Sequence, residues 1–408
     1  MTARARELAA LAPAYDGAHI RHVMPSAAAS LGLDGFLDRL GLPQASLTVV
    51  LMVDGLGDEL IARHSGHARF LASAWRSSAT GRVLDAAAPA TTAASIASLG
   101  TGEPPGRHGL VGYDVLAPWL DRVVNMLGGW DPAVDPARWQ PHEPVLRRAE
   151  RAGARVLTVS RPKFADSALT QAVLSGGEFL GATHLDARFR LAAGAITGHR
   201  PATGGVRQGS PQPLLMYLYV DELDKTGHRY GVDSPEWVRA LESLDREAET
   251  FVTRLRERFG DQLSVLLTAD HGMLDIAPEG RLDFSAEEAL LRGVRHTGGE
   301  PRFVHLYFDQ HASAAVRRQV HEVWEERFGD QAWIATRDEA VDAGWFGPVE
   351  DRVRPRIGDL LVAVHGPIAL YHVARTGPDP LTMVGQHGSL TDVEVKVPLL
   401  SLTGRAFG

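Results

Sequence analysis

The acids and histidines that could do chemistry in this chain stand just after apolar runs or between glycines. An acid ends LTVVLMVD, an acid and a histidine with D-x-x-x-H spacing follow LLMYLYV, and an adjacent acid and histidine follow LSVLLTA. A further histidine lies in VGQHGS. The six residues are Asp54, Asp224, His228, Asp270, His271 and His387. Carboxylate oxygens and imidazole nitrogens bind divalent metals such as zinc, so the set predicts a metal site.

A threonine in PATTAASIASLGTGEPPGRHG adds a candidate nucleophile. Thr91 and Thr92 are both good N-cap residues, and residues 93–99 have helix-forming composition before Gly100 and Gly102 end the helix. Free N–H groups at a helix N-terminus favour an anion such as phosphate. The segment therefore predicts a threonine hydroxyl beside an anion site, the simpler alternative being a threonine that only caps the helix.

Each motif also has an ordinary structural explanation when it is taken alone. Asp54 before Gly55 is a common turn signal. Asp270 and His271 are adjacent, so on a strand they would face opposite ways, but a turn at Gly272 lets both point to one centre. What favours a functional site is the number of such residues rather than any one motif.

Buried strands are expected to position these side chains. The run at 47–54 has no period of two and ends in an acid, as expected for a strand that is covered on both faces. The predicted strands are 47–54, 156–160, 214–220, 263–268, 303–308, 333–335 and 358–364. Side chains at the carboxyl ends of such strands lie where open α/β sheets bind their ligands.

The clearest helical pattern lies between the strands at 214–220 and 263–268. Ser234 is the expected N-cap, Pro235 takes the first helical position, and apolar residues recur at spacings of mostly three and four until Gly260 closes the helix. Shorter helices are expected around 27–31 and 34–40. Alternating strands and helices predict an α/β fold with a mainly parallel sheet and helices on both faces.

Composition narrows the classes of protein. The 408 residues are 44% apolar and 23% charged, which is typical of a soluble globular protein. The net charge of −8 gives no footprint for nucleic acid or an anionic membrane. Without cysteine there is no thiol nucleophile and no thiolate metal site. No signal peptide and no run of 18 apolar residues are evident, so a cytoplasmic location is expected.

Two smaller features concern the origin and layout of the chain. Only three lysines, Lys163, Lys225 and Lys396, stand beside 39 arginines, a bias that we associate with GC-rich bacterial genomes. The stretch 199–213, rich in glycine and proline, is expected to form a surface loop or a linker that is too short to divide the chain.

Together the motifs resemble those of the type I phosphodiesterase and nucleotide pyrophosphatase branch of the alkaline phosphatase superfamily. The resemblance consists of the Asp-Gly after the first strand, TG-x-x-P-x-x-HG at 101–109, Asp-x-x-x-His, Asp-His-Gly and a late Gly-x-His-Gly, in the same order. It implies one catalytic domain over 1–408, built as a three-layer sandwich. A small lid-like subdomain is expected to be inserted at about 283–364.

The resemblance also implies the roles of the candidate residues. Thr92, ten residues before Gly102, would be the nucleophile rather than Thr91, and hydrolysis would pass through a phospho-threonine intermediate. Two divalent metals, zinc first and manganese or iron as alternatives, would share the ligands. One metal would be held by Asp224, His228 and His387, and the other by Asp54, Asp270, His271 and the Thr92 oxygen.

Substrate identity stays open. Tyr113 stands where eukaryotic relatives have an asparagine that donates to the phosphoryl oxygen, and Lys163 could meet a substrate phosphate. The expected substrate is a small phosphate ester or a nucleotide-like molecule. Within this class the resemblance favours a phosphodiester or a nucleotide pyrophosphate. The alternatives are a phosphomonoesterase, a phosphonate hydrolase, a phosphomutase, or a catalytically silent metal-binding protein. Oligomeric state is not predicted.

Overall fold

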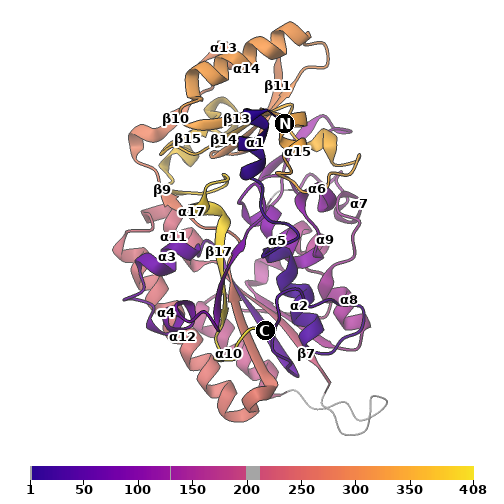
Figure 1. The fold of residues 1–408 in the computed structure, drawn as a ribbon, viewed down its shortest axis with the longest axis vertical. Helices are drawn as coiled ribbons and strands as arrows, with labels where there is room; N and C mark the ends of the chain where they lie inside the picture. Colours follow the sequence, from indigo (N-terminus) through magenta and orange to yellow (C-terminus); the bar gives the residue numbers. More distant parts are fainter. Residues whose placement is uncertain (1, 129, 199–211) are drawn as a thin grey trace.

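The strand β1 (Leu47–Val53), whose seven residues are all buried, lies at the centre of the larger sheet. The computed structural model describes residues 2–128, 130–198 and 212–408, and Figure 1 shows this sheet in its lower half. Across the sheet the strands are β2 (Gly81–Asp85), β17 (Lys396–Ser401), β8 (Leu263–Thr268), β1, β7 (Leu214–Val220), β5 (Arg155–Ser160) and β6 (Glu178–Gly181). The stretch 199–213 lies almost wholly outside the described residues.

The sheet is mainly parallel, as predicted. β1 pairs in parallel with β7 and β8, and β5 pairs in parallel with β7 and β6. The strands β7 and β8 have the bounds that the sequence predicted. The sequence did not predict β17, which runs antiparallel between β2 and β8.

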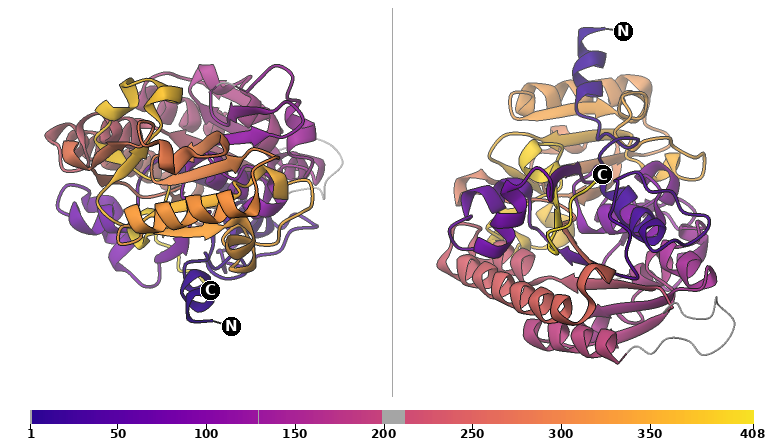
Figure 2. Two further views of the ribbon diagram at one scale, coloured as in Figure 1. Left: turned by 90° about the horizontal axis from the view of Figure 1, so that it is seen from above. Right: turned by 60° about the horizontal axis from the view of Figure 1, so that its bottom comes forward.

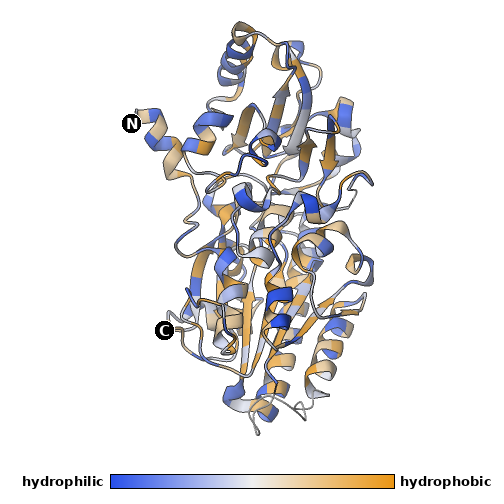
Figure 3. Cartoon of the chain, turned by 90° about the vertical axis from the view of Figure 1, so that its right-hand side faces the viewer, coloured by the Kyte–Doolittle hydropathy of each residue, from blue (hydrophilic) through white to orange (hydrophobic). Residues whose placement is uncertain are grey.

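Helices cover both faces of this sheet, which makes the predicted three-layer sandwich. Figure 2 shows α10 and α12 together on one face of the sheet, and the strands between the two layers of helices have mainly the hydrophobic colour in Figure 3. On the first face lie α10 (Leu185–Thr197), α11 (Glu222–Tyr230) and α12 (Pro235–Phe259), joined by α4 (Arg69–Arg76). On the second lie α2 (Val23–Ser30), α5 (Thr92–Thr101), α8 (Val145–Arg151) and α9 (Ala168–Val173).

The long helix α12 has the ends that its sequence predicted. The Ser234 hydroxyl accepts a hydrogen bond from the Trp237 N–H at 3.1 Å, and Pro235 occupies the first position. At the other end Gly260 has a φ of 51°, a conformation that favours glycine. Between these ends the apolar side chains, spaced three and four apart, face the sheet and α10.

The helix predicted at 34–40 is wrong, because this stretch forms turns. Gly35 and Gly41 at its ends both have positive φ angles. The Asp38 carboxylate accepts hydrogen bonds from the N–H groups of Leu40 at 2.9 Å and Leu42 at 2.7 Å. A short acidic side chain that binds nearby N–H groups replaces the hydrogen bonds of a helix, and so stabilises a turn.

A second, antiparallel sheet stands at the carboxyl ends of the central strands (top of Figure 1). Its order is β13 (Ala332–Thr336), β14 (Leu360–Val364), β12 (Phe303–Phe308), β11 (Val294–Glu300), β3 (Asp114–Ala117) and β4 (Arg122–Asn125). Most of it comes from the predicted insertion at about 283–364, but β3 and β4 come from a much earlier segment. A separate apolar core, including Trp324 and Phe328 of α14 (Ala314–Phe328), packs on it.

Short elements complete the structure around this small sheet. Two-stranded pairs are formed by β10 (Arg281–Asp283) with β15 (Ala369–Tyr371), and by β9 (Leu274–Asp275) with β16 (Gly385–Gln386). The remaining short α-helices of the described residues are α1 (Ala3–Ala10), α3 (Asp58–Arg63), α6 (Pro105–His108), α7 (Pro136–Trp139), α13 (Glu288–Leu291), α15 (Arg337–Asp342), α16 (Val373–Thr376) and α17 (Asp392–Val395).

A buried ion pair joins the two sheets. Arg302, between β11 and β12, donates two hydrogen bonds to the carboxylate of Glu394 in α17, at 2.8 and 2.9 Å, and neither side chain is exposed. Glu394 also accepts from the Ser389 N–H at 2.9 Å, and its backbone carbonyl accepts from the Gly272 N–H. This one carboxylate residue therefore supports the turns that follow His387 and His271.

Removing the arginine is expected to destabilise the protein strongly. Arg302→Met should lower the free energy of unfolding by about 3–5 kcal/mol, because Glu394 would stay buried without its partner. The matched control is Arg190→Met, which breaks the exposed pair with Asp186 and should cost under about 1 kcal/mol. Urea titrations of both variants measure the difference, and equal losses would contradict the role of the buried pair.

Candidate active site

The carboxyl ends of three neighbouring central strands bring acids and histidines to one edge of the sheet. Asp54 directly follows β1, and Asp270 and His271 follow β8. The ligating atoms of these three residues all lie within 4.8 Å of one another. Gly272 lets the chain turn after His271, so both members of the adjacent pair point to one centre as predicted.

A second group forms around Asp224, with His271 and His387 again within 4.8 Å. Asp224 and His228 lie one turn apart on α11 rather than on the strand-to-loop transition that the sequence predicted. The helix brings the two side chains together, because residues i and i+4 share one face of a helix. Asp224 Oδ1 lies 3.2 Å from His228 Nε2 and 3.8 Å from His387 Nε2.

Backbone carbonyls hold two of the histidine rings. His228 Nδ1 lies 2.8 Å from the Gly385 carbonyl, and His387 Nδ1 lies 2.9 Å from the Ala90 carbonyl. A carbonyl only accepts hydrogen bonds, so each ring carries a proton on Nδ1 and leaves its Nε2 facing Asp224. This arrangement is the one that metal-binding histidines use.

Asp54 is held from two sides. The Tyr219 hydroxyl donates a hydrogen bond to its Oδ2, and its Oδ1 lies 3.3 Å from His271 Nε2. The next residue, Gly55, has a φ of 75°, and a side chain there would come within 3.1 Å of the Asp224 backbone. Glycine is needed at this position because α11 approaches β1 so closely.

The cluster has the properties of a cation site. Three buried carboxylate oxygens make no hydrogen bond: Asp54 Oδ1, Asp224 Oδ1 and Asp270 Oδ2. Burial and the nearby acids raise the pKa of Asp54 well above its usual value. Burial opposes a charge on His271, but Asp270 and Asp54 outweigh it and raise its pKa to about 10. The site therefore attracts positive charge, and its oxygen and nitrogen ligands suit divalent metals.

Thr92 stands beside this cluster at the start of a buried helix. It is the first residue of α5, and its Oγ1 lies 3.2 Å from His271 Nε2. Thr91 is the N-cap, but its side chain makes no capping hydrogen bond. The first N–H groups of a helix have no partner within it, so an anion held at Thr92 would meet free donors. Gly100 does not end the helix as predicted, whereas Gly102 does.

Two cavities meet at Thr92 and Asp224. The central-sheet cavity, of about 290 Å³, is lined by Asp54, Lys163 and residues of β5 and β7. The small-sheet cavity, of about 340 Å³, is lined by His387 and residues of β11, β15 and β16. Tyr113, which is 38% exposed, lines both of them. The structure thus brings together all the residues that the sequence singled out, with Tyr113 and Lys163 at the cavity walls.

The sequence profile of the family described as type I phosphodiesterase / nucleotide pyrophosphatase matches residues 48–390. The chain belongs to this family. The matched region begins in β1 and ends after His387, so it includes every proposed ligand. The family assignment therefore agrees with the resemblance that the motifs carried.

Individual family relatives match over short segments only. Venom phosphodiesterase 2 of Crotalus adamanteus is 37% identical over 76 residues, which are 18% of this chain and 9% of the venom protein. Human ectonucleotide pyrophosphatase/phosphodiesterase family member 7 is 38% identical over 63 residues, 15% of this chain and 14% of that protein. Each alignment thus spans less than a sixth of the relative's own length.

Solved structures share the fold with this family member over most of its length. The alignment with human ectonucleotide pyrophosphatase/phosphodiesterase 5 covers 87% of each of the two chains, with a TM-score of 0.66 and 14% identity. Phosphonoacetate hydrolase from Sinorhizobium meliloti 1021, in complex with phosphonoacetate, covers 91% of this chain and 92% of its own, with a TM-score of 0.64 and 16% identity. These similarities show the alkaline-phosphatase-like architecture.

Several residues around the site were not predicted from the sequence. Tyr219 lies in the apolar run of β7, where a tyrosine looks like ordinary core, and only its contact with Asp54 distinguishes it. Asp221, next to the D-x-x-x-H motif, pairs with Arg161, Lys225 and the fully buried Arg188 instead of joining the metal cluster. Lys225 is a local partner, four residues along the chain, but nothing in the local sequence indicates Arg161 and Arg188, which come from distant segments.

Proposed function

We propose that this protein is a metal-dependent phosphodiesterase or nucleotide pyrophosphatase that uses Thr92 as its nucleophile. The observation that carries the proposal is the position of the Thr92 hydroxyl, at a helix N-terminus and beside the acid and histidine cluster. A nucleophile, free N–H donors and a cation site in contact are the parts that phosphoryl transfer needs.

Two metal ions would share the cluster. Asp224, His228 and His387 would hold one ion. The other would be held by Asp54, Asp270, His271 and Thr92. Zinc suits these ligands best, with manganese or iron as alternatives. Divalent ions bound there would polarise the phosphoryl oxygens and lower the pKa of the threonine hydroxyl.

The chain's own residues would carry the reaction in two steps. Thr92 Oγ1 attacks phosphorus, which forms a phospho-threonine ester and releases one arm of the diester as its alcohol. Water then cleaves the ester, returns Thr92 to its free form and releases the second product. The free N–H groups of α5 stabilise the charge on the phosphoryl oxygens in both steps. The Tyr113 hydroxyl donates to the same oxygens in place of an amide.

The substrate in this proposal is a small phosphate ester that reaches both cavities. Lys163, whose ammonium lies 4.8 Å from the centroid of the Phe164 ring, offers a positive charge to the part of the substrate in the central-sheet cavity. The segment of about 283–364 would act as a subdomain over the site, within one catalytic domain. None of the helices in the described part of the chain has the length and composition to cross a bilayer; a cytoplasmic location remains our proposal.

The comparison of a diester with a monoester tests this function. Metal-loaded protein should hydrolyse bis(p-nitrophenyl) phosphate at least about tenfold faster than p-nitrophenyl phosphate, and a chelator should abolish both activities. Release of p-nitrophenol, measured as kcat/KM for each ester, provides the ratio. The reverse preference would indicate a phosphomonoesterase. No turnover of either ester by the loaded protein would contradict the proposal and favour a phosphonate hydrolase, a phosphomutase or a silent metal-binding protein.

A phosphonate hydrolase is the second candidate, favoured by the charges of the central-sheet cavity. Lys163 and Lys225 are two of only three lysines in the chain, and both line this cavity. Lys225 is paired with Asp221, which leaves Lys163 to meet an anionic group near phosphorus. Release of inorganic phosphate from phosphonoacetate, in the absence of diester turnover, would support this candidate over the first.

A further inference from the structure

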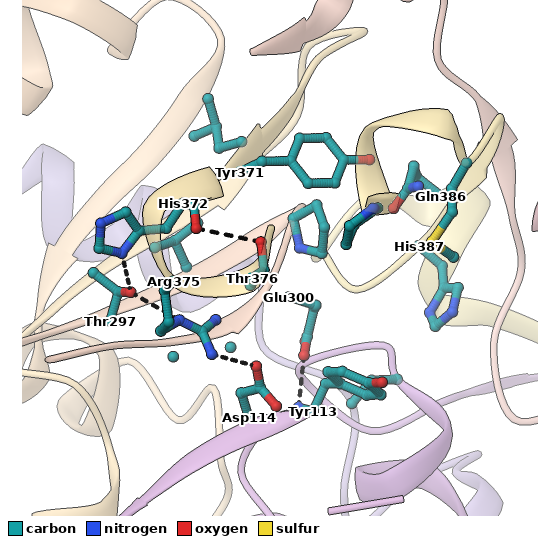
Figure 4. Close-up of a pocket in the computed structure, with 18 of the residues that line it drawn as sticks. Tyr113, Asp114, Thr297, Glu300, Tyr371, His372, Arg375, Thr376, Gln386 and His387 are labelled. Carbon is teal, nitrogen blue, oxygen red and sulfur yellow. Dashed lines mark hydrogen bonds and ion pairs between the residues drawn. The ribbon is translucent and has the colours of Figure 1, made fainter. Parts of the chain in front are cut away.

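Three buried polar side chains line the small-sheet cavity outside the proposed metal ligands. Glu300 ends β11, Tyr371 ends β15 and Gln386 ends β16, and their exposures are 7%, 3% and 2%. One atom of each has no hydrogen-bond partner among the residues that the structure describes: Glu300 Oε1, the Tyr371 hydroxyl oxygen and Gln386 Nε2. Leaving such groups unpaired costs free energy, so three in one cavity indicate a binding surface for a polar ligand. Figure 4 shows them with the residues around the cavity.

The three side chains limit what this ligand can be. Glu300 offers a carboxyl oxygen, Gln386 an N–H donor, and Tyr371 a hydroxyl that both donates and accepts. Asp114 and Arg375, also at this cavity, pair with each other at 2.7 Å (Figure 4). An anion would meet the carboxyl of Glu300, and an ammonium group would leave the Gln386 N–H without an acceptor. A group with several hydroxyls can satisfy all three because each hydroxyl donates and accepts.

The surroundings of Glu300 fit a neutral polar ligand. Its Oε2 accepts from the Tyr113 N–H at 2.7 Å, and its side chain packs against Gly388, where a Cβ would come within 2.4 Å of it. These contacts fix the side chain, and its Oε1 is left to accept a hydrogen bond from a hydroxyl. Phe284 and His372, stacked at 5.3 Å, form part of the cavity wall.

We propose that the small-sheet cavity binds a substrate arm that bears vicinal hydroxyl groups, as in a glycerol or sugar phosphodiester. The cavity also touches Thr92, so an arm attached to phosphorus at the nucleophile enters it directly. Its volume of about 340 Å³ is within the range of small-molecule sites. This assignment rests on the phosphodiesterase function proposed above and specifies its substrate.

The test compares two esters that differ only in the hydroxyls of one arm. Metal-loaded protein should hydrolyse glyceryl p-nitrophenyl phosphate about tenfold faster than propyl p-nitrophenyl phosphate in kcat/KM. Tyr371→Phe and Gln386→Met should each reduce this preference about two- to tenfold, because each removes one hydrogen-bonding group. Thr403→Val also removes a buried, unpaired hydroxyl. Thr403 follows β17 and does not line the small-sheet cavity, so this variant should keep both the rates and the preference.

A binding measurement separates this proposal from the enzymatic one. Thr92→Ala protein, loaded with metal, should bind the glyceryl ester more tightly than the propyl ester in calorimetry, whether or not the wild type turns them over. Equal affinities, or a preference unchanged in Tyr371→Phe and Gln386→Met, would overturn the hydroxyl site and leave the phosphodiesterase proposal intact. The same calorimetric comparison can be made between the 5′-(p-nitrophenyl) phosphates of adenosine and of 2′,3′-dideoxyadenosine. A higher affinity for the adenosine ester would show that ribose supplies the hydroxyls.

Discussion

Replacing Thr92 with alanine is expected to lower kcat for bis(p-nitrophenyl) phosphate by about 10³-fold or more, without loss of the fold or of bound metal. The hydroxyl oxygen is the atom that bonds to phosphorus in the proposed mechanism, so alanine removes the covalent step. The change is small, because alanine is a good helix former and, among the described residues, the Thr92 side chain has one hydrogen-bond partner, His271. Stopped assays with purified, metal-loaded protein measure the loss.

The neighbouring threonine provides the matched control. Thr91 is 1% exposed and lines the same small-sheet cavity, but its hydroxyl makes no capping bond. Thr91→Ala should therefore lower kcat by less than about tenfold. Circular dichroism and elemental analysis of both variants show that fold and metal are kept. If Thr91→Ala caused the large loss and Thr92→Ala did not, the nucleophile would be assigned to the wrong threonine.

Replacing His387 with alanine is expected to remove one of two bound metal ions and to lower diester turnover by about 10²-fold or more. Its Nε2 faces Asp224, and its ring stacks on His271 at 3.5 Å between centroids. Without it, one proposed ion would keep only Asp224 and His228. Elemental analysis after gel filtration should find two metals per chain in the wild type and one in the variant.

Two further variants test how the ligands are divided. Asp270→Asn should also lose one ion. This would be the ion proposed beside Asp54 and His271, because Asp270 lies in that group. His321→Ala changes a histidine on α14 away from the cluster and should keep both ions. Two metals per chain in His387→Ala, or none in either ligand variant, would contradict the division of the cluster into two sites.

The sequence predicted the four middle strands of the larger sheet and the place where the proposed ligands meet, because both depend on local patterns. The runs of β1, β7 and β8 are mostly apolar and are buried throughout, which is typical of strands covered on both faces. Neighbouring parallel strands end at the same edge, so the acids after them had to meet. The site at Asp54, Asp224 and Asp270 follows from this geometry without knowledge of any long-range contact.

The parts that the sequence did not predict depend on contacts between distant segments. The small sheet takes β3 and β4 from residues before 126, and the pairing of β3 with β11 has no local signal. Glu300, Tyr371 and Gln386 are ordinary residues in sequence, and only the cavity that they share distinguishes them. The error at 34–40 has a local cause, since the Asp38 carboxylate competed with the helical hydrogen bonds.

The place of β17 in the central sheet has a consequence for synthesis of the chain. β17 lies between β2 and β8, and its Lys396 meets Asp85 of β2 across 311 residues of sequence. At ribosomal rates, about 15–60 s separate the translation of these two residues. Throughout that time β2 lacks its native partner, as does the outer side of β8 from the time that β8 is made, and unpaired strand edges invite association with other chains. We therefore expect these edges to need protection, for example by a chaperone, until β17 leaves the ribosome.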